Sequence, residues 1–133
     1  MREDKVINIV IRWLSNNNYK NIKTKTSREH DVDITANTSY NRFLYIECKG
    51  DGSSNQVSEN NFVYALGQIV TRMKRSKFQR YAVAYPKSFE RKLNRIPWLF
   101  AKRNNLFVLL VDDDEKIERF TWKELKKYQE LVL

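Results

Sequence analysis

The sequence predicts one α/β domain in which helices flank a central mixed β-sheet. A chain of 133 residues suits a single hydrophobic core, so residues 1–133 are expected to form one domain. Predicted strands alternate with predicted helices in the second half of the chain, which is typical of a sheet covered on both faces. Helical crossovers precede the strands expected at 81–85 and 106–111, and such connections favour parallel neighbours. The expected order is α-β-β-β-α-β-α-β, followed by a short C-terminal strand and helix.

The first half of the chain begins with an amphipathic helix over residues 2–15. Its apolar positions Ile7, Val10 and Leu14 recur at the spacing of one helical face. Apolar and β-branched residues then predict three strands, and a polar stretch at 37–41 is expected to join the last two as a hairpin loop. These strands are expected at residues 22–26, 32–36 and 43–49.

The second half begins with a helix for which Ser58 is the expected N-cap. After the strand at 81–85, Pro97 is expected to kink the helix at 88–104 or to split it in two. The continuous apolar run at 106–111 is typical of a strand that is buried on both faces.

The C-terminal part is expected to contain an edge strand over residues 116–121, followed by a last helix. Thr121 and Glu124 have the spacing of a capping box at the start of that helix.

Positive charge is concentrated in one part of the chain. The net charge is +9, and residues 72–103 contain 11 basic residues but one acid, Glu90. The rest of the chain, with 14 basic and 15 acidic residues, is near neutral. Such a segment attracts polyanions and releases counterions from a phosphate backbone, although a solvated cationic surface would have the same composition. The expected DNA contacts are Arg72, Lys74, Arg75 and Lys77.

Cysteine content and hydropathy favour a cytoplasmic protein that does not associate with a membrane. The single cysteine, Cys48, cannot form an internal disulfide, which fits a reducing compartment. The apolar run at 6–11 is interrupted by Arg12 and is too short to span a bilayer.

Side-chain alternation brings together a group of charged residues. In a strand over 43–49, Glu47 and Lys49 share one face, whereas Cys48 points to the other. Asp31 and Asp33 likewise share a face of the preceding strand. If the two strands form a hairpin, Asp33 can lie beside Glu47, and Lys49 lies close to both.

Two carboxylates on adjacent strands repel each other, and a buried pair normally takes up a proton. A divalent cation relieves the repulsion, and hard oxygen ligands suit Mg²⁺. The cation can lower the pKa of a bound water and stabilise charge on a phosphoryl transition state, while Lys49 can hold or deprotonate that water. The competing interpretation is a surface hairpin with a weak Glu47–Lys49 ion pair.

The wider pattern resembles the core of the PD-(D/E)xK phosphodiesterase superfamily. Asp-Val-Asp-Ile is followed by a polar loop and then by Phe-Leu-Tyr-Ile-Glu-Cys-Lys-Gly. The resemblance implies a restriction endonuclease-like fold in which Asp33, Glu47 and the backbone carbonyl of Cys48 bind metal and Lys49 is the catalytic lysine. Val32 replaces the proline of the superfamily's name, and Asp31 is an alternative to Asp33 as the ligand.

Two further residues match the superfamily less specifically. Glu3 lies on the apolar stripe of the first helix, where relatives carry a glutamate, although an acid is also favoured at a helix N-terminus. Gln68 resembles a glutamine that follows the lysine motif in relatives. It lies opposite the apolar stripe of its helix, so it could equally be a solvent-exposed glutamine.

The sequence therefore predicts a Mg²⁺-dependent endonuclease acting on DNA in restriction, repair or junction resolution, with Mn²⁺ as a substitute metal. A homodimer is expected to be the working unit, because one site cuts one strand. A partner protein could supply specificity. The alternative is a catalytically inactive nuclease-like DNA-binding module or accessory subunit.

Overall fold

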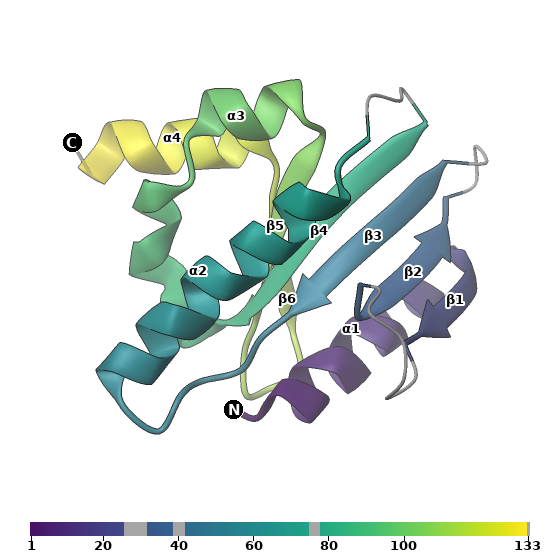
Figure 1. Ribbon diagram of the computed structural model, residues 1–133, viewed down its shortest axis with the longest axis horizontal. Coiled ribbons are helices and arrows are strands. Elements are labelled where there is room, and N and C mark those ends of the chain that lie inside the picture. The colour runs from purple at the N-terminus through teal and green to yellow at the C-terminus, as the bar shows by residue number, and fades with distance from the viewer. Residues whose placement is uncertain (26–31, 39–41, 75–77, 133) are drawn as a thin grey trace.

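One six-stranded mixed sheet forms the centre of the molecule (Figure 1). The computed structural model describes residues 1–25, 32–38, 42–74 and 78–132. The strands lie in the sheet in the order of the sequence. They are β1 (Lys20–Thr24), β2 (Ile34–Asn37), β3 (Phe43–Cys48), β4 (Gln79–Pro86), β5 (Leu106–Val111) and β6 (Ile117–Phe120).

The sheet is parallel at its centre and antiparallel at both edges. β3, β4 and β5 run parallel, whereas β1–β2, β2–β3 and β5–β6 are antiparallel pairs. The expected parallel pairing of β4 with β5 is therefore confirmed. In the β2–β3 pair, Ile34 is opposite Ile46, so the next position outward brings Asp33 opposite Glu47. The hairpin register that the sequence allowed is the one that forms.

Helices cover both faces of the sheet, as the alternation of elements predicted. The helix α1 packs on one face, where its residues Val6, Val10 and Leu14 join Ile46 and Leu109 in one core. The remaining helices pack on the opposite face in a second core. The helical elements are α1 (Glu3–Asn16), α2 (Asn55–Arg72), the 3₁₀ helix η1 (Lys87–Arg95), α3 (Trp98–Arg103) and α4 (Trp122–Val132).

The predicted N-cap of α2 was wrong. The helix begins at Asn55, and Ser54 rather than Ser58 is the cap, since its hydroxyl accepts a hydrogen bond from the Val57 N–H. Ser58 lies in the first turn, where its hydroxyl accepts from the Gly52 N–H. Both serines precede the apolar positions of the helix, so local spacing alone did not distinguish them.

Other boundaries differ from the prediction by a few residues. The segment 88–104 divides at Pro97, which separates η1 from α3. Of the two expected outcomes, a kink or a split, the split is the one that occurs. β1 starts at Lys20 rather than at residue 22. Asp33 lies in a bend immediately before β2 rather than within a strand over 32–36. Within the described ranges, no helix is long and apolar enough to cross a membrane.

Candidate active site

Asp33 and Glu47 form a buried carboxylate pair where β2 begins and β3 ends. Asp33 is 4% exposed, and its Oδ2 accepts a 2.8 Å hydrogen bond from the backbone N–H of Cys48. Glu47 is completely buried. The antiparallel register sets the two side chains opposite each other, and the bond to Cys48 fixes the orientation of the Asp33 carboxylate.

Glu47 is strongly perturbed. Burial, and then the negative charge of Asp33, raise the pKa of Glu47 to about 8, although Lys25 and Lys49 oppose this shift. Neither carboxylate oxygen of Glu47 accepts a hydrogen bond from a donor of the described residues, and a hydrogen bond with the Asp33 side chain adds to the raised pKa of Glu47. Buried polar atoms of folded proteins are nearly always paired, so these two oxygens indicate a position that accommodates a ligand.

Lys49 follows the last residue of β3 and points toward α1 and α2. Its Nζ lies 3.1 Å from Glu3 Oε1 and 4.9 Å from the centre of the Tyr64 ring on α2. Its backbone N–H donates to the Ala84 carbonyl and so extends the pairing with β4. Contacts with α1 and α2 therefore fix the ammonium group of Lys49, whose charge opposes the raised pKa of Glu47.

The close approach of Gly50 to α1 explains how Glu3 reaches this site. A Cβ atom at Gly50 would lie 2.5 Å from the Met1 carbonyl oxygen and 2.6 Å from the Glu3 nitrogen. Glycine is therefore required where the chain leaves β3. The amino-terminal end of α1 lies near the arrowhead of β3 in Figure 1, and the predicted position of Glu3 toward the sheet agrees with this arrangement.

Sequence reasoning missed Lys25, which contacts the carboxylate pair directly. The Lys25 Nζ lies 3.1 Å from Asp33 Oδ1, and the Lys25 N–H donates to the Asp33 carbonyl. Burial opposes protonation, but the hydrogen bond to Asp33 and the charges of nearby carboxylates raise the pKa of Lys25. Lys25 follows β1, and no local motif linked it to residues eight and 22 positions further along the chain.

The structure does not bring Gln68 into hydrogen-bond contact with this site. It lies one helical turn after Tyr64 and therefore on the same side of α2. Its side chain makes no hydrogen bond to Asp33, Glu47 or Lys49. Asn61, on the same face, donates to the Gly50 carbonyl and ties α2 to the segment after β3.

The two predicted DNA contacts that the structure describes, Arg72 and Lys74, lie at the far end of α2. Arg72 is the last residue of the helix, and Lys74 is exposed just beyond it. From Tyr64 to Arg72 the helix advances about 12 Å, so these cations do not adjoin the carboxylates. Arg75, Lys77 and the alternative ligand Asp31 lie outside the described residues.

The donor atoms of this site are of the kind that a hard divalent cation prefers. The oxygens of Glu47 and the Oδ1 of Asp33 are anionic oxygen donors, and the Cys48 carbonyl lies between Glu47 and Lys49 in the sequence. The described part of the chain contains no group of three or more His, Cys, Asp or Glu side chains that could hold a metal ion. Two carboxylates are nevertheless a usual protein contribution to Mg²⁺, which keeps waters and binds substrate phosphates.

An open hollow of about 320 Å³ lies on the Glu47 side of the sheet. Tyr45, two residues before Glu47, and Thr35, two residues after Asp33, line it together with Lys23 from β1. Phe43 at its outer end is 47% exposed. The hollow is lined from three strands, β1, β2 and β3, and it offers polar, cationic and aromatic side chains to a ligand.

Two solved structures have the same fold. One is an XisH family protein from Nostoc punctiforme, with a TM-score of 0.59 and 19% identity over 87% of this chain and 98% of that chain. The other is an fdxN element excision controlling factor protein from Anabaena variabilis, with a TM-score of 0.60 and 21% identity over 89% and 98%. The sequence matches no protein-family model, and no curated protein is similar to it. At these identities the likeness establishes a shared α/β fold.

Proposed function

We propose that this protein is a metal-dependent nuclease that hydrolyses phosphodiester bonds in DNA. The observation that carries the proposal is Glu47, which is fully buried beside Asp33 and accepts no hydrogen bond from a donor of the described residues. A carboxylate in this position is unfavourable for stability unless a cation joins it. Lys49 supplies the additional cationic side chain that phosphodiester hydrolysis requires near the reacting phosphate.

The chemistry divides among the residues by position. Asp33 Oδ1 and the Glu47 oxygens, with the Cys48 carbonyl, would hold Mg²⁺, for which Mn²⁺ is the substitute. The bound cation would supply a water of lowered pKa and neutralise charge on the phosphate. Lys49 would orient the attacking water or balance the charge that develops in the transition state. Glu3 holds the Lys49 ammonium group at 3.1 Å and thereby restricts where it can act.

The order of elements supports a finer proposal about the fold. A helix on one sheet face, an antiparallel three-stranded unit carrying Asp33, Glu47 and Lys49, and a crossover helix to a parallel strand fit the restriction endonuclease-like arrangement of the PD-(D/E)xK superfamily. Each chain carries one proposed site, and one site cuts one strand at a time. We therefore also propose a homodimer as the form that cuts duplex DNA.

A DNA-binding factor without cleavage activity is the second candidate. One of the structures that share the fold is named an excision controlling factor, and such a factor could act on DNA without cutting it. The basic residues would serve this function equally well. The intact group of Asp33, Glu47 and Lys49 favours the nuclease.

A cleavage assay separates the two candidates. Supercoiled plasmid, single strands and a four-way junction are incubated with the protein and Mg²⁺ or Mn²⁺, with and without chelator. The nuclease proposal expects at least one substrate to be cut with metal and none with chelator. DNA binding without cleavage under every metal condition would instead support the non-cleaving factor.

A further inference from the structure

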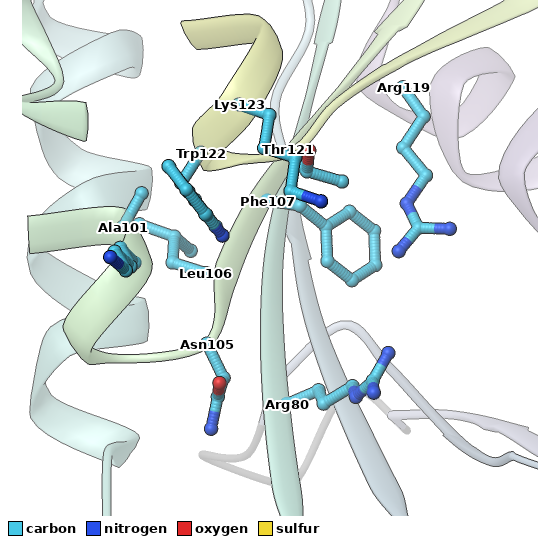
Figure 2. Close-up of a pocket in the computed structure, with 10 residues that line it drawn as sticks. Arg80, Ala101, Asn105, Leu106, Phe107, Arg119, Thr121, Trp122 and Lys123 are labelled. Atoms are coloured by element: carbon cyan, nitrogen blue, oxygen red, sulfur yellow. The ribbon is translucent and has the colours of Figure 1, made fainter. Parts of the chain in front are cut away.

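A second hollow, of about 280 Å³, lies at the opposite end of the sheet from the carboxylate pair. It lies where β4 and β5 begin, whereas Glu47 and Lys49 lie where β3 ends. Among the residues that the structure describes, no carboxylate lines it, but four cationic side chains do, those of Arg80, Lys102, Arg119 and Lys123. Figure 2 shows Arg80 reaching in from one side of this pocket, and Arg119 and Lys123 from the other.

Aromatic rings hold three of these cations in place. The Lys102 Nζ lies 4.6 Å from the centre of the Trp122 ring, and Lys123 Nζ approaches the same ring at 5.8 Å. The guanidinium carbon of Arg119 lies 4.7 Å from the centre of the Phe107 ring. Cation–π contacts fix the direction of a side chain without neutralising its charge, so the cations remain available to an anion.

Two acidic residues near the pocket, Glu118 and Glu124, do not line it. Glu124 is close enough to Arg119 for that charge to contribute to its lowered pKa, but its carboxylate accepts hydrogen bonds from the Thr121 N–H and hydroxyl. Glu118 precedes Arg119 on β6, where alternation directs it to the other face. The start of α4 adjoins the pocket, and Glu124 occupies the first turn of that helix without lining the pocket.

A neighbouring hollow extends the positive surface beyond the size of one small anion. Asn105 lines both hollows, and Lys74 and Arg103 line the neighbouring one. Phosphates repeat along a nucleic-acid strand, so a row of cation-lined hollows suits a strand better than a single small ion.

We propose that the pocket formed by Arg80, Lys102, Arg119 and Lys123 binds a phosphate group of a nucleic-acid strand. This site lies apart from the carboxylate pair and binds whether or not the protein cleaves DNA. A strand held there would be fixed at the end of the sheet remote from Glu47.

The test measures strand binding in chelator, so that cleavage plays no part. Single-stranded oligonucleotides labelled at the 3′ end, with a 5′-phosphate or a 5′-hydroxyl, are titrated by fluorescence anisotropy at several salt concentrations. The pocket variant is Lys102→Gln/Arg119→Gln. The matched control is Arg91→Gln/Lys116→Gln, which removes the same charge from exposed positions outside the pocket. Circular dichroism verifies that both variants are folded.

We expect the pocket variant to lose about tenfold or more in affinity and to reduce the slope of log affinity against log salt by about one to two. The control should change affinity by less than about twofold. Tighter binding of the 5′-phosphate strand would identify the terminal monoester as the ligand, and equal binding would identify a backbone diester. Equal losses in both variants, or no loss in the pocket variant, would overturn the proposal. The proposal would also be overturned if inorganic phosphate stabilised the parent but not the pocket variant, while both proteins bound the strand with the same affinity.

Discussion

Glu47 is the residue on which the proposed chemistry depends most. It is the most completely buried charged residue of the described structure, and its oxygens accept no hydrogen bond from a donor there. A carboxyl group in such a position favours its protonated form in the folded, metal-free protein. Folding stability is therefore linked to pH through this group.

The linkage predicts the pH dependence of the metal-free protein. The folded pKa of about 8 exceeds the ordinary value of 4.5, so the folded state binds more protons than the unfolded state between these values. The contribution of Glu47 to stability is fully present below about pH 4.5 and is lost as the pH rises through 8. In chelator, the melting temperature of Glu47→Gln should equal that of the parent at low pH and exceed it by about 5 °C at pH 8.5. Parallel melting profiles at all pH values would contradict the assignment.

Lys25 makes a separate prediction, because its ammonium group occupies the Asp33 oxygen that a metal ion would use. In Lys25→Gln, calorimetry in the absence of DNA should show Mn²⁺ binding about three to ten times more tightly than in the parent. Lys23→Gln is the matched control, since Lys23 is an exposed lysine of β1, two residues before Lys25. Weaker Mn²⁺ binding in Lys25→Gln would mean that Lys25 supports the site rather than competing for it.

At the residue scale, side-chain alternation was sufficient to predict the pairing of Asp33 with Glu47 and the nearby position of Lys49. These residues lie on or beside β2 and β3, which follow each other in the sequence and pair as a hairpin. Lys25 was not predictable, because its contact depends on where the chain passes after β1. Ser54 and Ser58 were indistinguishable for a related reason: both are of a residue type that caps helices, and both lie near the start of α2.

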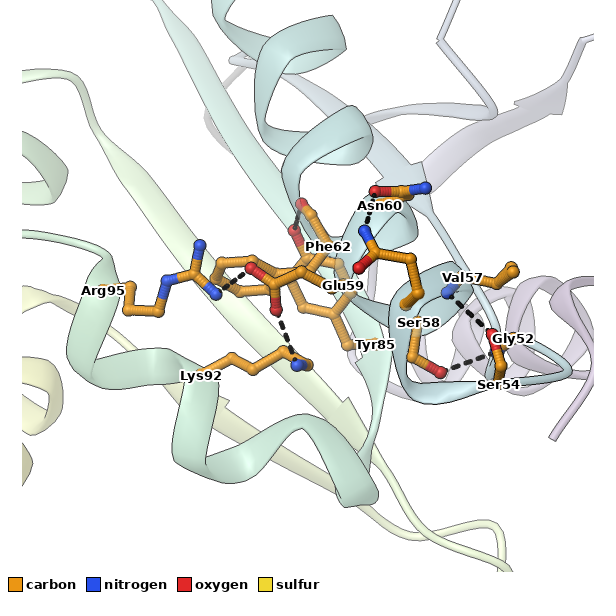
Figure 3. Close-up of polar contacts among 11 residues, drawn as sticks. Gly52, Ser54, Val57, Ser58, Glu59, Asn60, Phe62, Tyr85, Lys92 and Arg95 are labelled. Atoms are coloured by element: carbon orange, nitrogen blue, oxygen red, sulfur yellow. Dashed lines mark hydrogen bonds and ion pairs between the residues drawn. The ribbon is translucent and has the colours of Figure 1, made fainter.

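At the element scale, α2 links the proposed site to the basic end of the molecule. Glu59 accepts from Lys92 and forms an ion pair with Arg95, both on η1, and these partners lower the pKa of Glu59 (Figure 3). The Tyr85 hydroxyl donates to the Phe62 carbonyl at 2.8 Å and joins α2 to β4. These contacts hold the helix that presents Tyr64 to Lys49.

Two glycines provide a matched test of how the elements are arranged. At Gly50 an added Cβ would collide with the backbone of Met1 and Glu3, so Gly50→Ala should displace α1 and destabilise the protein by about 1–3 kcal/mol. Gly67 lies inside α2 with nothing within 4 Å of such a Cβ. Gly67→Ala should therefore stabilise the protein by about 0.5–1 kcal/mol. Chemical denaturation measures both, and equal effects would contradict the close approach at Gly50.

At the scale of the whole molecule, the two functional surfaces that we propose lie at different ends of one sheet. The sequence predicted the basic segment, but the pocket that includes Arg80 also takes Arg119 and Lys123 from beyond that segment. Five elements, β4, α3, β5, β6 and α4, meet there only after the sheet has formed. Local patterns therefore predicted the strands and helices well, whereas sites assembled from distant segments required the structure.

The basic end should make binding to DNA strongly dependent on salt. Lys74 is exposed beside the end of α2, so Lys74→Gln should reduce the slope of log affinity against log salt by about one. Lys116 is an exposed lysine immediately before β6, and Lys116→Gln should leave the slope unchanged. An unchanged slope in Lys74→Gln would locate the DNA on another surface.

The most direct test of the proposed nuclease compares the Lys49→Ala variant with the parent in single-turnover DNA cleavage with Mn²⁺. Calorimetry measures Mn²⁺ binding in the same preparations. Lys49 is not a metal ligand in this account, and its removal deletes a positive charge near the carboxylate pair. Binding of Mn²⁺ should therefore be retained or strengthened, DNA should still bind, and cleavage should fall by a factor of about 100 or more. Cleavage by Lys49→Ala at the rate of the parent would contradict the proposed site.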